Sequence, residues 1–584
     1  MNQLNAGLLD LPNEILFIIL KKLDNMYVLY SLFDVGNQRL DMIVQEKTFT
    51  KTLNFVVTTS FDDILSISDS MLNRFCINIL PKINLNVKSL ILESGSMERI
   101  LLAADYPNLV ELKLFNFNDK VVVPYFTGKS PFRRIFQQQI TDLILVYKSD
   151  INILLERQYQ NGVHEYILKF FESLKHLSIT GLPSLLSLNN LPLTICYSST
   201  LYKLSVFVNR FGDCLALLDG RLKQLTMFIV IIENTVYDSS VVCNMDDLPN
   251  LKCFSLTCRC FTDDYDTQVL PLLRRMSNLE ELAFNIINQN RTTFVDGTQI
   301  NNEILVHMPR LYKFDFNINT ETKLHHLVHY LSSDDIQRTF TNIGYQHVGC
   351  ILYYINSSAI CHVFSLPFMF HYLENIGNTF PPIIFGHVTE LALYDIVPFK
   401  HEFFIRIARS FPLLKKLRII NSKSQSQMSN NWNSKDNQLY SIVEYPYLIS
   451  LCILVSHIDY VEQFLNETKT HLPHLTKLRV DYDQLAVVTN NFTRDTTRVN
   501  CAKVKQLIIE KTLVHSKDFN VYFPLFTGAK RNESSNQYQT IIIRPQYHER
   551  KKNEESENEQ ALKNNDSADK NKIEIEECDD DDED

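Results

Sequence analysis

The sequence predicts an α/β protein in which strands and helices alternate along most of the chain, behind a helical segment at its start. Three observations lead to this prediction. A short apolar unit, L-x-x-L-x-L, recurs many times, and a proline lies just ahead of many copies. The chain of 584 residues is also too long for one globular core, because such cores stop growing at about 250 to 300 residues. We therefore expect an array of stacked units.

The repeated unit occurs twelve times in clear form, and two weaker copies begin at Val87 and Ile140. Intervals between successive copies run mostly from 21 to 34 residues. That length accommodates one strand, one helix and two turns. The clear copies begin at Leu109, Leu174, Leu201, Leu222, Leu251, Leu279, Leu311, Val388, Leu414, Leu448, Leu475 and Val504.

Each unit is predicted to be a short strand with one buried face, because its last apolar positions alternate with polar ones. Pro107, Pro249 and Pro446 precede three units and end the helical stretches before them. Helices are expected at residues 403–411 and 461–471. Stacked units bury one another's apolar edges. We therefore expect a curved solenoid with parallel strands on its concave side and helices on its convex side.

The long interval between Leu311 and Val388 interrupts the array. We expect an irregular insert at about residues 320–387, in which residues 325–330 and 364–376 have helical patterns. Two interpretations stay open for this stretch, degenerate repeats or an inserted helical segment. A hidden hydrolase or transferase site would also have to lie here, and it would require a deep polar pocket.

The start of the chain contains an amphipathic helix within LDLPNEILFIILKKL, residues 9–23. Pro12 suits a helix start, where its missing N–H needs no partner, and Glu14 lies near the positive end of the helix dipole. A second apolar set covers residues 27–35. Helices this short bury little surface on their own, so exposed apolar residues here suggest a partner. The apolar stripe, at spacings of three and four, consists of Leu11, Ile15, Leu16, Ile19, Leu20 and Leu23.

Charge is concentrated at the end of the chain. Residues 551–584 carry 15 acidic and 5 basic side chains, which accounts for the whole net charge of −10. The remaining body is balanced and lacks the basic excess that supplies most nucleic-acid affinity, so no nucleic-acid partner is expected. The acidic tail has little to bury and is predicted to be disordered. One hypothesis is that residues 574–584 compete for basic surface on the repeats.

The apolar runs, the start of the chain and the cysteines all predict where the protein is located. No apolar run approaches the roughly 18 residues that span a bilayer, and no basic region with a cleavage site is visible at the start. The 12 cysteines include no C-x-x-C pair, which fits reduced thiols. We expect a soluble cytoplasmic or nuclear protein without a membrane partner.

Catalytic and metal-binding patterns are weak. Gly128-Lys129-Ser130 resembles the end of a phosphate-binding loop, but Val123 stands where that loop needs glycine. His325, His326 and His329 have the spacing of half a zinc site without the glutamate of a metalloprotease. Cysteines on one predicted strand, Cys253, Cys258 and Cys260, suit small buried residues better than metal ligands. The sequence therefore predicts no catalytic residue, cofactor or metal.

The string LPNEIL, followed by Ile18, Ile19 and Leu23, resembles an F-box over residues 8–48. This likeness implies docking on a Skp1-type adaptor and, through it, on a cullin. Many F-boxes finish with Arg-Trp or Lys-Trp, whereas Arg39 is followed here by Leu40. The likeness implies that the adaptor contacts Leu11, Pro12, Ile15, Leu16, Ile19, Leu20, Leu23, Val28, Leu29, Leu32 and Val35.

The repeated unit resembles the leucine-rich repeat, whose consensus adds Asn or Cys three positions beyond the last apolar residue. Asn209 and Asn319 occupy that place, and most other units lack it. The array implied by this likeness is therefore irregular. The expected organisation is an F-box, then a helical linker at 49–86, the repeat array at 87–545 with its irregular insert, and the disordered acidic tail at 546–584.

Together the two resemblances imply a non-catalytic substrate receptor of a ubiquitin ligase, which holds an unknown protein target through the repeats. The alternative is a leucine-rich-repeat scaffold without ligase function. Residues that alternate with buried strand positions should face the target, and the later repeats concentrate positive charge there. The candidate contacts are Lys113, Ser178, Lys203, Ser205, Lys313, Asp315, Lys416, Arg418, Ser450, Lys477 and Arg479.

Overall fold

A computed structural model of the chain describes residues 8–58, 64–118, 122–147, 167–181, 198–232, 246–327, 331–342, 344, 347–355, 357–425, 441–509 and 518–525. The chain divides into two compact units, residues 1–508 with 515–527, and residues 509–514 with 528–584. Every helix and strand named below belongs to the first unit. The predicted acidic tail at 546–584 and the last part of the predicted array, 526–545, lie outside the described residues.

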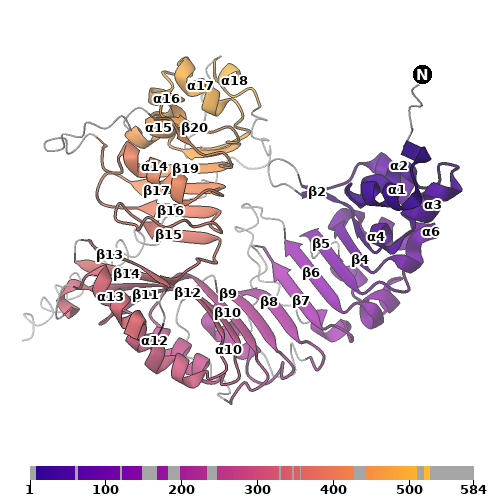
Figure 1. Cartoon of the computed structure of the whole chain (residues 1–584), viewed down its shortest axis with the longest axis horizontal. Helices are drawn as coiled ribbons and strands as arrows, with labels where there is room; N and C mark the ends of the chain where they lie inside the picture. The colour runs from indigo at the N-terminus through magenta and orange to yellow at the C-terminus, as the bar shows by residue number, and fades with distance from the viewer. Residues whose placement is uncertain are drawn as a thin grey trace, which may run out of the picture. The chain divides into compact units, whose positions relative to one another are not determined.

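The first sheet has twelve strands in the order β1-β4-β5-β6-β7-β8-β9-β10-β11-β12-β14-β13 (Figure 1). Every neighbouring pair from β1 to β12 is parallel, as predicted for the repeats. The strands are β1 Thr52–Asn54, β4 Ser89–Glu93, β5 Glu111–Phe117, β6 Asp142–Tyr147, β7 His176–Thr180, β8 Lys203–Val208, β9 Met227–Ile232, β10 Cys253–Thr262, β11 Glu281–Arg291, β12 Lys313–Lys323, β13 Val348–Ile355 and β14 Ser358–Ser365.

Short helices connect these strands, and alternate strand residues are buried as expected for a sheet with one covered face. In α10, for example, Cys214 and Leu217 are buried. The helices are α5 Asp69–Arg74, α6 Leu80–Ile83, α7 Met97–Leu102, α10 Phe211–Leu217, α11 Leu270–Arg274, α12 Gly297–Glu303 and α13 Ser333–Asn342. Among the described helices, none combines the length and apolar character needed to cross a membrane.

The second sheet has six strands, all parallel to their neighbours. They are β15 Tyr372–Ile376, β16 Glu390–Tyr394, β17 Lys416–Asn421, β19 Ser450–Ser456, β21 Lys477–Val480 and β22 Gln506–Ile508. Two-residue strands β18 and β20, Val443–Glu444 and Thr470–His471, form a separate parallel pair. The accompanying helices are α14 His401–Ser410, α15 Ile458–Leu465, α16 Tyr482–Val488, α17 Asp495–Cys501 and α18 Phe519–Tyr522.

The central apolar residues of the repeated units align in rows across both sheets. Thirteen of the fourteen predicted units coincide with strands in this alignment. The unit predicted at Leu222 is wrong by three residues, because β9 begins at Met227 and places Phe228 in the row. Leu222 and Leu225 both fit the same spacing, and the structure uses Leu225. The first row is Leu53, Leu90, Leu112, Leu143, Leu177, Leu204, Phe228, Phe254, Leu282 and Phe314.

The insert predicted at 320–387 is mostly strand rather than helix. Strands β13 and β14 form an antiparallel pair that ends the first sheet against β12. The helix predicted at 364–376 is wrong, because Phe364 and Ser365 belong to β14 and Tyr372–Ile376 forms β15. Residues 324–326 form one 3-10 turn, and 328–330 lie outside the described residues.

The N-terminal helices predicted from the sequence are present. They are α1 Asn13–Leu20, α2 Asn25–Leu32, α3 Gln38–Val44 and α4 Lys47–Thr50, after a 3-10 turn at Leu8–Asp10. The segment 49–86, predicted to be a helical linker, also contains β1 and the antiparallel pair β2 Val56–Thr58 and β3 Ile64–Ser66. Leu53 pairs with Leu90 and is buried, so the sheet begins earlier than the predicted start of the array at 87.

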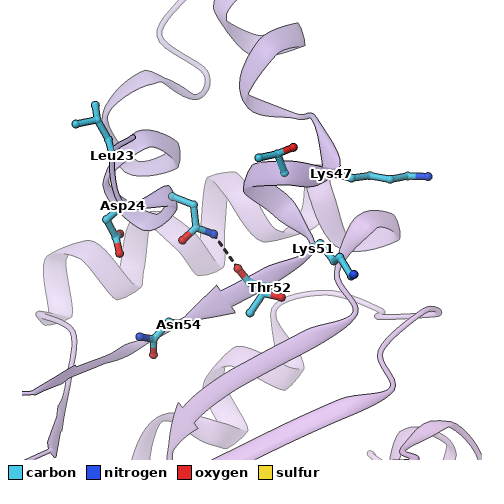
Figure 2. Close-up of a pocket in the computed structure, with 8 residues that line it drawn as sticks. Leu23, Asp24, Lys47, Lys51, Thr52 and Asn54 are labelled. Atoms are coloured by element: carbon cyan, nitrogen blue, oxygen red, sulfur yellow. Dashed lines mark hydrogen bonds between the residues drawn. The ribbon is translucent and has the colours of Figure 1, made fainter. Parts of the chain in front are cut away.

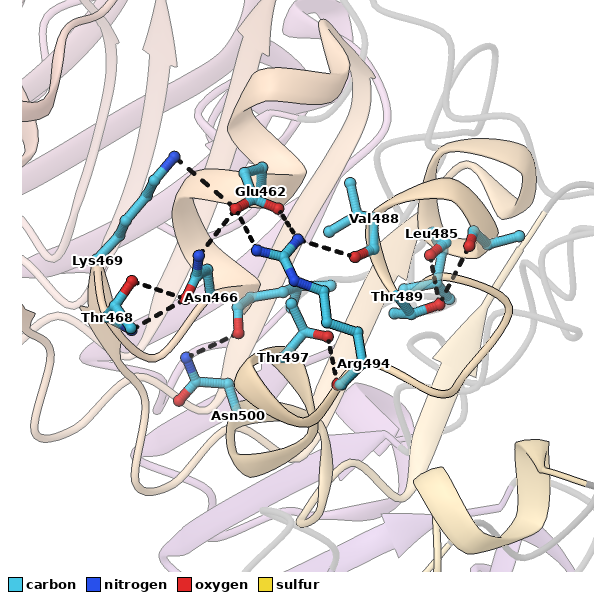
Figure 3. Close-up of polar contacts among 12 residues, drawn as sticks. Glu462, Asn466, Thr468, Lys469, Leu485, Val488, Thr489, Arg494, Thr497 and Asn500 are labelled. Carbon is cyan, nitrogen blue, oxygen red and sulfur yellow. Dashed lines mark hydrogen bonds and ion pairs between the residues drawn. The ribbon is translucent and has the colours of Figure 1, made fainter.

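A polar network joins α15 and α17 beside the second sheet (Figure 3). Arg494 holds the Glu462 carboxylate through two hydrogen bonds, of 2.5 and 2.9 Å, and Asn466 donates a third of 2.8 Å. Burial alone raises the pKa of Glu462, but these bonds and the Arg494 charge hold the pKa below its usual value. The buried Asn500 side chain donates to the Thr470 carbonyl at 2.7 Å and accepts from the Leu472 amide at 3.0 Å.

Candidate functional site

Helix α1 is apolar on nearly all its sides, with the sequence NEILFIIL. A helix of this kind is normally buried all round. Here Leu16 and Leu20 point into the protein and are almost fully covered, whereas Ile15, Ile18 and Ile19 are exposed by 44, 56 and 38%. The second apolar face of α1 therefore has no cover within the described part of the chain.

Polar contacts hold this helix in place. Asp24 caps α2 by accepting hydrogen bonds from the amides of Met26 and Tyr27, at 2.9 and 3.2 Å. Arg39, on α3, donates to the Leu9 carbonyl at 2.6 Å and to the Leu11 carbonyl, which ties α3 to the chain entering α1. Because Asp24 caps α2 and Arg39 ties α3 to the chain entering α1, the helices that surround the exposed face of α1 are held in place.

Exposed apolar side chains concentrate at these helices. Of the 31 large apolar side chains that are exposed in the described residues, nine lie between residues 8 and 42. Such clusters on a folded surface mark interaction sites more often than scattered single residues do. The nine are Leu8, Leu9, Ile15, Ile18, Ile19, Leu23, Tyr27, Val35 and Met42. We call this set the N-terminal apolar surface.

The structure separates the predicted adaptor contacts into three groups by exposure. Leu16, Leu20, Val28 and Leu29 are buried in the protein's own core, so their side chains are not exposed to a partner. Leu11 and Leu32 are half-buried. The residues left exposed for a partner are Pro12, Ile15, Ile19, Leu23 and Val35.

Sequence reasoning missed five members of this surface as contacts, namely Leu8, Leu9, Ile18, Tyr27 and Met42. The angular position of each residue around α1 could have separated exposed from buried residues in part. Ile15, Ile18 and Ile19 lie within one arc of α1, and Leu16 and Leu20 lie on another, at 100° per residue. The apolar spacing of three and four includes both arcs, so it could not separate the inward face from the outward one.

An open hollow of about 460 Å³ lies between these helices and β1 (Figure 2). Asn25 crosses it and donates two hydrogen bonds of 2.8 Å, to the carbonyls of Phe49 and Thr52. Lys47 and Lys51 line the same hollow. The hollow thus lies where the helical segment is joined to the sheet, and the Asn25 bonds make that joint specific.

The exposed face of the first sheet carries paired charges. Lys113 lies over the Phe115 ring at 4.6 Å, and Lys313 lies 3.6 Å from Glu281 and 3.8 Å from Asp315. Burial raises the pKa of Asp315 despite the neighbouring lysine. These candidate target contacts therefore carry charges of both signs, and the charge of Lys313 is partly neutralised by its acidic neighbours.

Beside them on this face, Lys203 pairs in register with His176. Burial and the Lys203 charge lower the pKa of His176, although Asp142 lies 3.3 Å away. Lys203 is half-buried. The middle of the first sheet thus holds less net positive charge than its lysines alone suggest.

The second sheet gathers the remaining candidates into two rows. Lys416 and Lys477 lie in one row, and Arg418 and Arg479 lie in the next, with one strand between each pair. The predicted equivalence of these positions is confirmed. Lys416 forms a 2.8 Å ion pair with Glu390, so the positive charge of the first row is partly neutralised.

The weak metal patterns stay weak in the structure. The rings of His325 and His326 meet edge to face with their centroids 4.2 Å apart, and His329 lies outside the described residues. Cys258 is buried and Cys253 is half-buried on β10. Within the described ranges, no three His, Cys, Asp or Glu side chains gather closely enough to hold a metal ion.

Comparison with known proteins adds no assignment. No family model and no curated protein matches the chain. The functional conclusion therefore depends on the N-terminal apolar surface and on the faces of the two sheets.

Proposed function

We propose that this protein is the substrate-recognition subunit of a Skp1-cullin-F-box ubiquitin ligase, with an F-box at its start and a leucine-rich-repeat solenoid after it. The observation that carries the proposal is the N-terminal apolar surface. Ile15, Ile18 and Ile19 are exposed on a helix whose opposite face is fully packed. Such a face is stabilised by covering it with another protein. The resemblance of LPNEIL to an F-box identifies the partner as a Skp1-type adaptor.

The solenoid supplies the second half of the proposal. In the described residues, ten parallel strands of the first sheet and six of the second give long faces whose side chains alternate outward. Single repeats contribute a few contacts each, and stacked repeats give an extended surface for a protein target. Transfer of ubiquitin then requires no reactive residue on this chain. Holding a target lysine near the charged enzyme raises its effective concentration. The protein would act in the cytoplasm or nucleus.

The decisive experiment measures affinity for a purified Skp1-type adaptor. Ile15→Asp with Ile19→Asp places two charges on the exposed face of α1 and should abolish binding, because an unpaired carboxylate in an apolar contact costs several kcal/mol. The control is Ile77→Asp with Ile384→Asp, at side chains exposed by 71 and 73% elsewhere. Both variants should keep the wild-type circular dichroism and melting temperature.

Two outcomes would count against the proposal. Undiminished adaptor binding by the Ile15 and Ile19 variant would remove α1 as the docking face. A folded wild-type protein that fails to bind the adaptor would leave the alternative, a leucine-rich-repeat scaffold without ligase function.

A further inference from the structure

The exposed face of the second sheet has a floor of short side chains with cations on both sides. In the register of β17, β19 and β21, Lys416 lies beside Ser450, and Ser450 lies beside Lys477. In the next row, Arg418 lies beside Cys452, and Cys452 lies beside Arg479. Ser450 and Cys452 are half-buried, so the floor is open to solvent. We call these six residues the cationic frame.

The dimensions of the frame follow from sheet geometry. Neighbouring strands lie about 4.8 Å apart, so β17 and β21 are separated by about 10 Å across β19. Long cationic side chains from both outer strands therefore reach the space above Ser450 and Cys452. A small anion placed above Cys452 has Arg418 on one side and Arg479 on the other, whereas the Lys416 ammonium pairs with Glu390 on β16.

Neighbouring groups modify this charge without cancelling it. Glu390 pairs with Lys416, and Lys477 and Arg479 have interactions within the chain. Arg418 is exposed and lies near Glu374, whose carboxylate accepts a 2.6 Å hydrogen bond from Tyr372. Guanidinium groups have five donors each, so a contact within the chain leaves donors for a ligand. The carboxyl groups of Glu390 and Glu374 lie beside Lys416 and Arg418, and Lys477 and Arg479 bring two further positive charges to the frame.

We propose that the cationic frame binds a phosphorylated segment of the target protein, with the phosphate above Ser450 and Cys452. A phosphate presents three acceptor oxygens and close to two negative charges, so it can engage Arg418 and Arg479 together. A single carboxylate has two oxygens and one charge, so it can accept the paired hydrogen bonds of only one guanidinium group. This inference rests on the proposed function, because that function makes the bound segment part of a ligase target. Binding of the segment itself requires neither the adaptor nor ubiquitin.

The test uses the full-length protein and three degenerate peptide libraries that share a fixed central residue, phosphoserine, serine or glutamate. Binding to each library is measured by fluorescence anisotropy, with inorganic phosphate as competitor. The phosphoserine library should bind, and it should bind more tightly than the glutamate library. Arg418→Gln with Arg479→Gln should weaken this binding by more than about tenfold, because charge-assisted hydrogen bonds are lost.

Matched variants separate the frame from general effects of charge. Lys88→Gln with Lys175→Gln removes two exposed cations that precede β4 and β7 of the first sheet, outside the candidate contacts, and should leave phosphopeptide binding unchanged. Ser450→Glu places a carboxylate on the floor, where neighbouring cations stabilise it, and should abolish phosphopeptide binding while the protein stays folded. Adaptor affinity is measured on every variant, so loss of phosphopeptide binding with normal adaptor binding is assigned to the frame alone.

Three results would overturn the inference. They are equal binding of the serine and phosphoserine libraries, equal binding of the glutamate and phosphoserine libraries, and full retention of phosphopeptide binding by Ser450→Glu. The second result would identify the ligand as an acidic segment without phosphate. Failure of adaptor binding with intact phosphopeptide binding would overturn the proposed function and leave the frame standing.

Discussion

Leu16 and Ile19 lie about one turn apart on α1, yet their surroundings are opposite. Leu16 is completely buried, and Ile19 is exposed by 38%. The likeness to an F-box implied that both contact the adaptor, and the apolar spacing of three and four includes both. Only Ile19 is placed to do so. A substitution at Leu16 reports on folding, and a substitution at Ile19 reports on docking.

This difference gives a stability prediction. Leu16→Ala leaves a cavity in the core and should lower the free energy of unfolding by about 2 to 5 kcal/mol. Ile19→Ala should change it by less than about 0.5 kcal/mol, as is usual at exposed positions. Urea unfolding of both variants checks the pair. Equal destabilisation would contradict the inward and outward faces assigned to α1.

Glu374 gives a prediction about pH. Burial raises its pKa above the usual value, although the Tyr372 hydroxyl and the Arg418 charge act in the other direction. The folded state therefore favours the protonated form. Its stabilising contribution is complete below the unfolded pKa, about 4.3, and is lost as pH rises through the folded pKa.

Glu374→Gln removes this ionisation and keeps an oxygen that can accept from Tyr372. The melting temperature of the variant should equal that of the wild type at low pH and exceed it at neutral pH. The control, Glu444→Gln at an exposed side chain, should show no such divergence. A neutral-pH melting temperature below that of the wild type would show that the Arg418 attraction outweighs burial.

Among the elements, the strands were predictable and several connections were not. For most units the apolar pattern fits only one strand position, so thirteen of them were located correctly. Two strands in the same register, β1 and β15, were missed. In β1 the unit starts with Thr50, and in β15 Asn375 stands where the predicted units have their last apolar residue.

The misassigned helix at 364–376 has a different cause. Phe364 packs in β14 against Phe368 and Phe385, at ring distances of 5.6 and 5.7 Å. Phe385 lies outside the predicted helix, and β14 pairs with β12 and β13 from earlier in the chain, so local spacing carries no information about these contacts. The antiparallel strand is therefore selected by tertiary contacts that no local pattern records.

Asn500 tests how the helices of the second sheet are held. Asn500→Ala removes the partners of the Thr470 carbonyl and the Leu472 amide, both inside the protein. Unsatisfied buried groups of this kind cost about 1 to 3 kcal/mol each, so unfolding free energy should fall by at least about 2 kcal/mol. Asn278→Ala, whose 3.0 Å bond to the Pro249 carbonyl is exposed, should cost less than about 1 kcal/mol. Similar losses in urea unfolding would contradict a structural role for Asn500.

At the scale of the whole molecule, the predicted boundary between residues 48 and 49 is not a boundary in packing. One hydrophobic core runs from Leu16 through Val87 and Leu204 to Val363. The N-terminal helices share this core with the first sheet, and Asn25 adds its hydrogen bonds to Phe49 and Thr52. The apolar pattern located the helices of this segment, but it could not show that the segment and the sheet share one core.

The shared core has a consequence for how a ligase built on this chain would choose lysines. A receptor whose docking segment hangs on a loose tether lets its cargo sample many positions, and any nearby lysine can react. Here the adaptor would bind a helix that shares its core with the first sheet. A target bound to that sheet would therefore move little relative to the adaptor. Which lysine is modified would then depend on its angle and distance from the charged enzyme. Two targets with the same recognition segment could differ completely in their fate.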